Sequence, residues 1–246
     1  MGFAIDLDGV IWLADDPIPG SADAVARLRA AGERVVFCTN NSSLPVGEVE
    51  AKLARHGIPA RGDVLTSAIA AVTLVEPGER VLVCAGEGVV EALEARGAVV
   101  VLEGEAEVVM VGFHSTFDAD RLRIAVHALA RGARLVATND DLTYPTPAGL
   151  VPGGGAILAA VVAEAGVDAV VAGKPNAPMA VLVRDRVGST GTMVGDRFDT
   201  DGRFAHVLGY RFALVLTGVE DTSVGMDPPP DLIAPDLAAL VDQLLG

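Results

Sequence analysis

Short apolar runs alternate with amphipathic stretches along most of the chain, and this alternation restricts the fold more than any other feature of the sequence. Apolar runs such as residues 3–7 and 34–38 are typical of buried strands. Residues 118–131 and 237–245 instead repeat apolar side chains three and four positions apart, which indicates helices. Strands that alternate with helices predict an α/β fold built on a largely parallel sheet.

The periodicity also predicts where the elements lie and where the chain divides. Strands are expected at residues 3–7, 34–38, 80–84, 98–102, 107–112, 134–138, 169–172, 192–195 and 211–216. Helices are expected at residues 21–32, 43–57, 66–75, 87–96, 118–131, 154–165, 176–187 and 237–245. The alternation pauses at a predicted hinge, Glu76-Pro77-Gly78-Glu79. We therefore expect a split core at residues 1–78 and 172–246, with an inserted domain at residues 79–171.

Composition excludes several classes of partner. The net charge of −15 argues against nucleic acid, which binds basic faces, and against anionic membranes. No apolar run approaches the roughly 18–20 residues that span a bilayer. The two cysteines, Cys38 and Cys84, both end β-like runs and are expected in the core. Their scarcity, and the lack of a secretion signal pattern, predict a cytoplasmic protein.

Two carboxylates crowd the end of the first predicted strand. Asp6 and Asp8 are one residue apart and are followed by Gly9, which lets the backbone turn sharply. Such crowding is unfavourable unless a cation lies nearby. One carboxylate could attack a substrate while the other handles a proton or a metal. Alternatively, the Asp-Gly pair only forms a turn.

Three more polar motifs follow apolar runs: Thr39-Asn40, Lys174, and the segment from Asp196 to Asp201. The carboxyl ends of parallel strands line the ligand crevice of open α/β sheets, so these groups could converge there. Lys174 is one of two lysines beside sixteen arginines, which suggests a need for a compact charge. Each motif also has a structural interpretation, as a helix cap, a surface lysine or a turn.

Together these groups supply what phosphoryl transfer requires. They include a carboxylate nucleophile, a second carboxylate for proton transfer and donors for phosphate oxygens. They also include an ammonium and further carboxylates that can hold Mg²⁺.

The motifs occur in one order along the chain. They are Asp6-Leu7-Asp8-Gly9-Val10, Thr39-Asn40-Asn41-Ser42, Gly173-Lys174-Pro175, and Gly195-Asp196 with Asp201 five residues after Asp196. This set resembles the four motifs of the haloacid dehalogenase-like phosphohydrolases over nearly the whole chain. The region from Ala137 to Ile157 resembles the large α/β cap of the NagD-like branch. That branch includes nucleotide, p-nitrophenyl, phosphoglycolate and glycerol-3-phosphate phosphatases.

The resemblance implies a Rossmann-like three-layer core with a parallel sheet and an inserted α/β cap domain. It also implies a role for each site residue. Asp6 would be the nucleophile and Asp8 the general acid and base. Asp6, the backbone carbonyl of Asp8, and Asp196 would hold Mg²⁺, with Asp201 in support. Thr39, Asn40 and Asn41 would bind the phosphoryl group, and Lys174 would neutralise it and orient Asp6.

We therefore expect a Mg²⁺-dependent phosphatase of small phosphorylated metabolites, with glycerol phosphate or phosphoglycolate ahead of nucleotides or sugars. The polar residues between Asn139 and Tyr144 suit recognition of hydroxyl groups. A receiver-like domain and a non-catalytic protein that binds a phosphorylated ligand remain alternatives. Large caps of this kind often mediate dimers in relatives, which leaves a homodimer through the cap open. His114 is expected in a loop or as a contact of the cap, and Trp12 is expected in the core, with the lining of the pocket as the alternative. Lys52 is expected on the surface.

Overall fold

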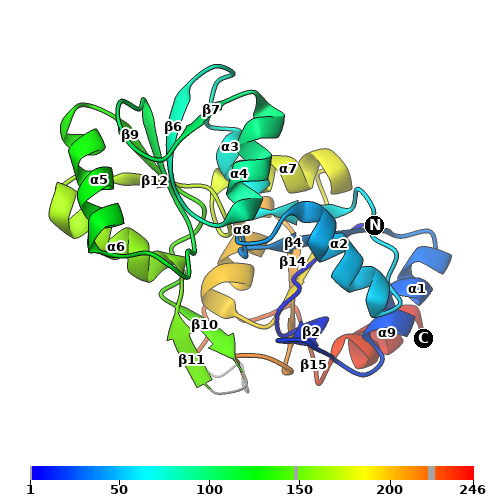
Figure 1. Ribbon diagram of the computed structural model, residues 1–246. Helices are drawn as coiled ribbons and strands as arrows, with labels where there is room; N and C mark the ends of the chain where they lie inside the picture. Colours follow the sequence, from blue (N-terminus) through cyan, green and yellow to red (C-terminus); the bar gives the residue numbers. More distant parts are fainter. Residues whose placement is uncertain (1, 147–148, 221–224) are drawn as a thin grey trace.

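The computed structural model describes residues 2–146, 149–220 and 225–246, and these form two parallel sheets side by side (Figure 1). The first sheet has six strands, and every neighbouring pair is parallel. Their order is β15 (Leu232–Ala234), β14 (Arg211–Val215), β13 (Thr192–Gly195), β1 (Gly2–Ile5), β4 (Arg34–Thr39) and β5 (Val64–Thr66). The α/β class expected from the sequence is confirmed.

Helices cover both faces of the six-stranded sheet. Side chains of a strand alternate between faces, so Phe3 and Ile5 pack on one side and Ala4 on the other. The first side is covered by α1 (Ser21–Ala30), α2 (Val46–Arg55) and α9 (Leu237–Leu245). The second side is covered by α3 (Ser67–Val72), α7 (Ala177–Val187) and α8 (Arg203–Leu208). This arrangement gives three layers.

The second sheet comes entirely from the middle of the chain. Its five parallel strands are β12 (Ala169–Val171), β9 (Arg134–Ala137), β8 (Val108–Val111), β6 (Arg80–Cys84) and β7 (Val99–Val101), in that order. Helices α5 (Ala119–Ala130) and α6 (Gly154–Ala165) cover its outer face. Helix α4 (Glu87–Arg96) covers the other face and packs on α3, so one apolar cluster includes residues of both sheets.

Two short antiparallel hairpins lie outside these sheets. One pairs β2 (Trp12–Leu13) with β3 (Asp16–Pro17), and the other pairs β10 (Thr143–Thr146) with β11 (Gly149–Pro152). Among the described residues, neither hairpin pairs with a strand of the large sheets. The β10–β11 hairpin projects from the lower left of Figure 1.

The sequence periodicity missed these hairpins and several other short elements. The π-helical turn η1 (Phe198–Gly202), helix α8 and strand β15 were not expected. Residues 64–66 form strand β5, and the helix that was expected from residue 66 to residue 75 ends at Val72. Elements of two to six residues are too short to show a period. Both cysteines are fully buried, as expected, and no helix in the described part of the chain is long and apolar enough to cross a bilayer.

The two sheets meet where helix α4 touches the loop after β4. A Cβ atom on Gly88 would overlap the carbonyl oxygens of Leu44 and Ser42, so only glycine fits there. The buried Ser42 hydroxyl also lies 2.9 Å from the hydroxyl of Thr138, which follows β9. The loop that carries the predicted phosphate-binding residues is thus packed directly against the second sheet.

This contact predicts that Gly88→Ala destabilises the protein. The added methyl group forces apart two backbone segments, a kind of overpacking that costs about 1–3 kcal/mol. Gly47→Ala is the matched control, because Gly47 is likewise the second residue of a helix and a Cβ atom there meets nothing within 4 Å. Urea unfolding should show a lower free energy of unfolding for Gly88→Ala and an equal or higher one for Gly47→Ala. Equal stability of the two variants would contradict this packing.

Candidate active site

Three adjacent strands deliver the predicted site residues to one edge of the six-stranded sheet. Asp6 follows β1, Thr39 ends β4 and Asp196 follows β13. Because β1 lies between β13 and β4 and all three are parallel, their carboxyl ends meet. Lys174 reaches the same place from the loop between β12 and α7.

A cavity of about 370 Å³ lies over these strand ends. Its lining includes seven of the predicted residues: Asp6, Asp8, Thr39, Asn40, Asn41, Lys174 and Asp196. Residues from the middle of the chain line the opposite side, namely Phe113, Asn139, Asp141, Thr143, Tyr144, Val151, Gly153 and Gly154. Asp201 is fully buried and does not line the cavity. His114 does not line it either, and its ring faces Thr116 of its own loop.

Lys174 lies between two carboxylates in the interior. Its Nζ is 2.8 Å from Asp6 Oδ1 and 2.7 Å from Asp201 Oδ1, and the side chain is 2% exposed. Burial lowers the pKa of Lys174, but Asp201 and Asp6 together raise that pKa well above its usual value. The ammonium is therefore charged at every physiological pH. The second oxygen of Asp201 accepts the backbone N–H of Arg197 at 3.3 Å, so both its oxygens are occupied.

Asp196 has one oxygen bonded and one without a partner. Oδ2 accepts the backbone N–H of Val219 at 2.7 Å, whereas Oδ1 is buried with no hydrogen-bond partner in the described structure. Burial, followed by the charges of Asp201 and Asp6, raises the pKa of Asp196 to about 8. A Cβ atom on Gly9 or Gly218 would overlap this carboxyl group, so the two glycines make room for it.

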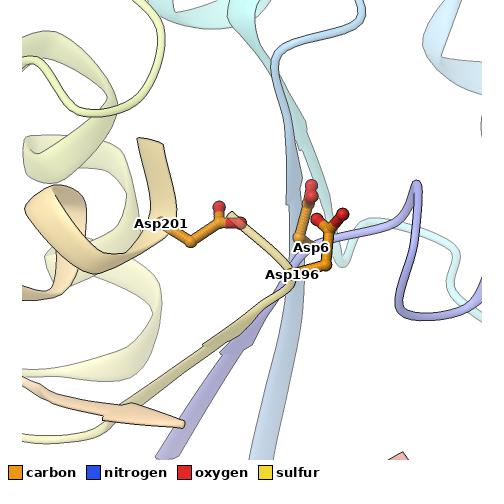
Figure 2. Close-up of side chains that lie close together, drawn as sticks. All are labelled: Asp6, Asp196 and Asp201. Carbon is orange, nitrogen blue, oxygen red and sulfur yellow. The ribbon is translucent and has the colours of Figure 1, made fainter. Parts of the chain in front are cut away.

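These observations fit a divalent cation. Oxygen atoms of Asp6, Asp196 and Asp201 lie within 4.8 Å of one another, and Figure 2 shows the three side chains converging from separate elements. An all-oxygen set of carboxylates suits Mg²⁺, which completes its shell with water and substrate oxygens. Asp6 and Asp196 face the cavity, and Asp196 Oδ1 lacks a hydrogen-bond partner among the residues that the structure describes. Both are therefore better placed than Asp201, whose oxygens already accept hydrogen bonds.

Asp8 is held by two hydrogen bonds to the same oxygen. Its Oδ1 accepts the indole N–H of Trp12 at 3.0 Å and the hydroxyl of Tyr144 at 3.1 Å. Burial raises the pKa of Asp8, and these two hydrogen bonds oppose that rise. Trp12 is buried, as expected, and it also donates a hydrogen bond to a site residue. Lys52 is not the surface residue expected, because its ammonium stacks 4.4 Å from the Trp12 ring centroid and its side chain is 16% exposed.

The residues after β4 form a compact turn at the cavity wall. Thr39 Oγ1 accepts the backbone N–H of Asn41, and Asn41 Oδ1 accepts the backbone N–H and the hydroxyl of Ser43. The Asn40 amide group donates to Asp141 and to the carbonyl of Lys174, and its oxygen accepts the Lys174 N–H. The Asn40 side chain therefore ties β4 to the lysine loop and to the middle of the chain.

The fold and site define a class of hydrolase in which carboxylates at the end of a parallel sheet face a covered cavity. Models of haloacid dehalogenase-like hydrolases match residues 3–99 and 171–240. The chain belongs to this family, and it is a phosphatase that hydrolyses phosphoric monoesters.

Several relatives match over almost the whole chain. The chain is 37% identical to the D-glycerol 3-phosphate phosphatase of Mycobacterium tuberculosis over 96% of its length and 69% of that protein. It is 31% identical to an acid sugar phosphatase of Staphylococcus aureus over 98% of its length and 97% of that protein.

Solved structures agree with this placement. A glycerol phosphate phosphatase of Mycobacterium tuberculosis crystallised with magnesium has a TM-score of 0.89 at 35% identity, over 97% of this chain and 75% of that one. A p-nitrophenyl phosphatase from Archaeoglobus fulgidus has a TM-score of 0.91 at 30% identity, over 98% of each chain. The donor set described above is therefore one for Mg²⁺, the cofactor of phosphatases in this family.

The raised carboxyl pKa values predict how pH and Mg²⁺ act on stability. The pKa of Asp196 is about 8 in the folded protein and 3.8 for an ordinary aspartate, so the folded state binds the extra proton between these values. Stability of the metal-free protein should therefore fall as pH rises from about 5 to about 8. Mg²⁺ binds the deprotonated carboxylate and therefore competes with that proton. The rise in Tm on adding Mg²⁺ should accordingly become larger as pH rises over the same range.

Thermal unfolding in EDTA and in excess Mg²⁺ at several pH values checks this expectation. Asp196→Asn is the control, since an amide does not ionise in this pH range and is a weaker metal ligand. Its Tm should fall less with pH and should respond little to Mg²⁺. A metal-free wild-type Tm that stayed level or rose between pH 5 and pH 8 would contradict the prediction.

Proposed function

We propose that this phosphatase acts on small phosphomonoesters through an aspartyl-phosphate on Asp6. The arrangement of Lys174 supports this most directly. Its ammonium bonds one oxygen of Asp6, so it fixes the carboxylate and offsets the charge of an approaching phosphoryl group. Asp201 holds the ammonium from the buried side. An ionised carboxylate that lines a cavity beside a fixed cation can attack phosphorus.

In the first step, an oxygen of Asp6 forms a bond to phosphorus while the bond from phosphorus to the ester oxygen breaks. Asp8 gives its proton to that ester oxygen, which leaves as an alcohol. In the second step, Asp8 takes a proton from a water molecule that attacks the phosphorus. This releases phosphate and restores the Asp6 carboxylate. A Mg²⁺ ion held by Asp6, the Asp8 carbonyl and Asp196 would supply positive charge to the phosphoryl oxygens.

The turn after β4 would hold the phosphoryl group. The Thr39 hydroxyl, already accepting a backbone N–H, keeps its own proton for a phosphate oxygen. Asn40 would act through its backbone N–H, because its side-chain amide is bonded to Asp141 and Lys174. Asn41 lines the cavity beside them.

We further propose that residues 79–171 form a cap over a core made of residues 1–78 and 172–246. All strands of the five-stranded sheet lie in that segment, and cavity residues from it face the catalytic edge. A cover of this kind excludes bulk water during transfer and limits the size of the leaving group. Polymers such as proteins or nucleic acids do not fit a cavity of about 370 Å³ beneath it.

The charges of the cavity favour a leaving group without a second phosphate. Among the described residues, four carboxylates and two cations line it, and one of those cations, Lys174, is already paired with Asp6 and Asp201. The other, Arg197, lies 3.5 Å from Asp199. The hydroxyl of Thr143 remains for a neutral oxygen of a substrate, whereas the amide of Asn139 and the hydroxyl of Tyr144 already donate within the site. We propose glycerol 3-phosphate as the substrate, in agreement with the name of the mycobacterial relative.

Sugar phosphates are the second candidate. The Thr143 hydroxyl can equally bind a hydroxyl group of a sugar, and several relatives are named acid sugar phosphatases. Phosphoglycolate is less favoured, because Lys174 is already paired and its carboxylate would depend on Arg197, the other cation that lines the cavity in the described part of the chain.

Replacement of the proposed nucleophile should abolish turnover. Asp6→Asn keeps the shape of the side chain, but an amide does not attack phosphorus. Phosphate release in Mg²⁺ should fall below one-thousandth of the wild-type rate, whereas circular dichroism should be unchanged. For Asp8→Asn, the rate of phosphate release from alkyl esters should fall roughly 10²–10⁴-fold. A rate for Asp6→Asn above one-tenth of wild type, in protein free of deamidation, would exclude Asp6 as the nucleophile.

A panel of phosphomonoesters tests the substrate assignment. Glycerol 3-phosphate should give the highest kcat/KM, followed by hexose monophosphates, with nucleoside monophosphates and sugar bisphosphates at least tenfold lower. The ranking follows from the charge and size of the cavity. Bisphosphates or nucleotides at the top of the panel would overturn the choice of substrate and leave the phosphatase activity in place.

A further inference from the structure

Two donors from distant parts of the chain meet on one oxygen of Asp8. The indole N–H of Trp12 comes from the hairpin just after the first motif, four residues away. The hydroxyl of Tyr144 comes from strand β10, 136 residues away. One donor therefore belongs to the proposed core and the other to the proposed cap.

We propose that Tyr144 is a positioning residue for Asp8, so that the acid and base of the reaction is aligned only while the β10–β11 hairpin lies on the core. This inference rests on the proposed role of Asp8 and goes beyond it. It assigns a part in proton transfer to a residue of the hairpin, which neither attacks phosphorus nor binds the metal.

The two hydrogen bonds decide which oxygen of Asp8 carries the proton. A carboxyl oxygen that accepts two donors has no room for a proton of its own. When Asp8 is protonated, the proton therefore lies on Oδ2, and Oδ2 gives it to the ester oxygen as that oxygen leaves. When Asp8 is ionised, Oδ2 accepts a proton from the attacking water. Two donors from different directions also prevent the carboxyl group from rotating.

Trp12 is itself fixed, whereas Tyr144 belongs to a separate hairpin. The indole is 4% exposed, and the Lys52 ammonium stacks on it while bonding Asp15 at 3.2 Å. The β10–β11 hairpin pairs with no other described strand, so no ladder of the large sheets holds it. The Tyr144 hydrogen bond is therefore the one that movement of the hairpin would break.

The surroundings of this contact agree with such a role. A second cavity of about 240 Å³, whose lining includes Trp12 and Lys52, adjoins the first, and both Asp8 and Tyr144 line the two cavities. The hydrogen bond thus lies on the boundary between them. When the hairpin lifts, the boundary opens, and Asp8 loses one of its donors at the same moment.

The test compares leaving groups in Tyr144→Phe, which removes only the hydroxyl. Ethyl phosphate needs a proton on its leaving oxygen and p-nitrophenyl phosphate does not, and neither carries a hydroxyl that Tyr144 could recognise. With Mg²⁺ present, kcat/KM for ethyl phosphate should fall about tenfold, a part of the roughly 10²–10⁴-fold that general acid catalysis supplies. The value for p-nitrophenyl phosphate should change less than twofold.

Tyr210→Phe is the matched control, because it also removes one hydroxyl, which donates to the carbonyl of Gly188 far from the cavity. This variant should leave the ratio of kcat/KM for ethyl phosphate to kcat/KM for p-nitrophenyl phosphate unchanged. Trp12→Phe, which removes the other donor, should shift the ratio in the same direction as Tyr144→Phe. In the variant that carries both Tyr144→Phe and Trp12→Phe, kcat/KM for ethyl phosphate should fall by less than the product of the two single effects, because both donors act on one oxygen.

The outcomes separate this inference from the proposed function. Suppose that Asp8→Asn lowers kcat/KM more for ethyl phosphate than for p-nitrophenyl phosphate. If Tyr144→Phe then lowers kcat/KM for both esters equally, or for neither, the positioning role is wrong. A loss confined to glycerol phosphate, with ethyl phosphate unchanged, would assign Tyr144 to substrate recognition and also overturn it. If Asp8→Asn itself shows no discrimination, or the wild type releases no phosphate, the proposed mechanism fails instead.

Discussion

The ion pairs of Lys174 are the interaction on which the rest of the site depends. Several carboxylates share a small volume at the end of a sheet, and their mutual repulsion disfavours the ionised forms. One buried ammonium between Asp6 and Asp201 relieves part of that repulsion. Asp201 contributes no surface to the cavity, yet it determines where the ammonium lies. A buried charge without its partner is costly, so the three residues form a unit.

The glycines near the site serve the same cluster. Gly9 and Gly218 leave space for the Asp196 carboxyl group, and a Cβ atom on Gly195 would overlap Asp201. Gly173 lies against the Asn40 amide oxygen and the carbonyl of Thr138. The carboxylates are therefore held by close backbone approach as well as by charge. Such precise placement is what transition-state stabilisation by fixed groups requires.

Much of this arrangement could be predicted from the sequence because it depends on strand order and local chemistry. Asp6, Thr39 and Asp196 each end an apolar run, and the carboxyl ends of neighbouring parallel strands necessarily meet. The contacts of Trp12, Lys52 and Tyr144 could not be predicted in the same way. Trp12 looks like any core residue, and Lys52 lies in an amphipathic helix. Tyr144 lies 136 positions from Asp8 in the sequence and reaches it only through the fold of the segment between them. The short hairpin that carries Tyr144 also has too few residues to show a period.

The apolar cluster that runs through both sheets has a consequence for how the molecule behaves as a whole. Ala4 and Val36 of the first sheet belong to the same cluster as Val81 and Met110 of the second, with helices α3 and α4 between them. Excision of residues 79–171 would leave the buried face of α3 open to water. The segment from residue 79 to residue 171 therefore shares one apolar interior with the first sheet. We therefore expect both sheets to unfold as one cooperative unit, and a protein that lacks residues 79–171 would need a different, more polar α3.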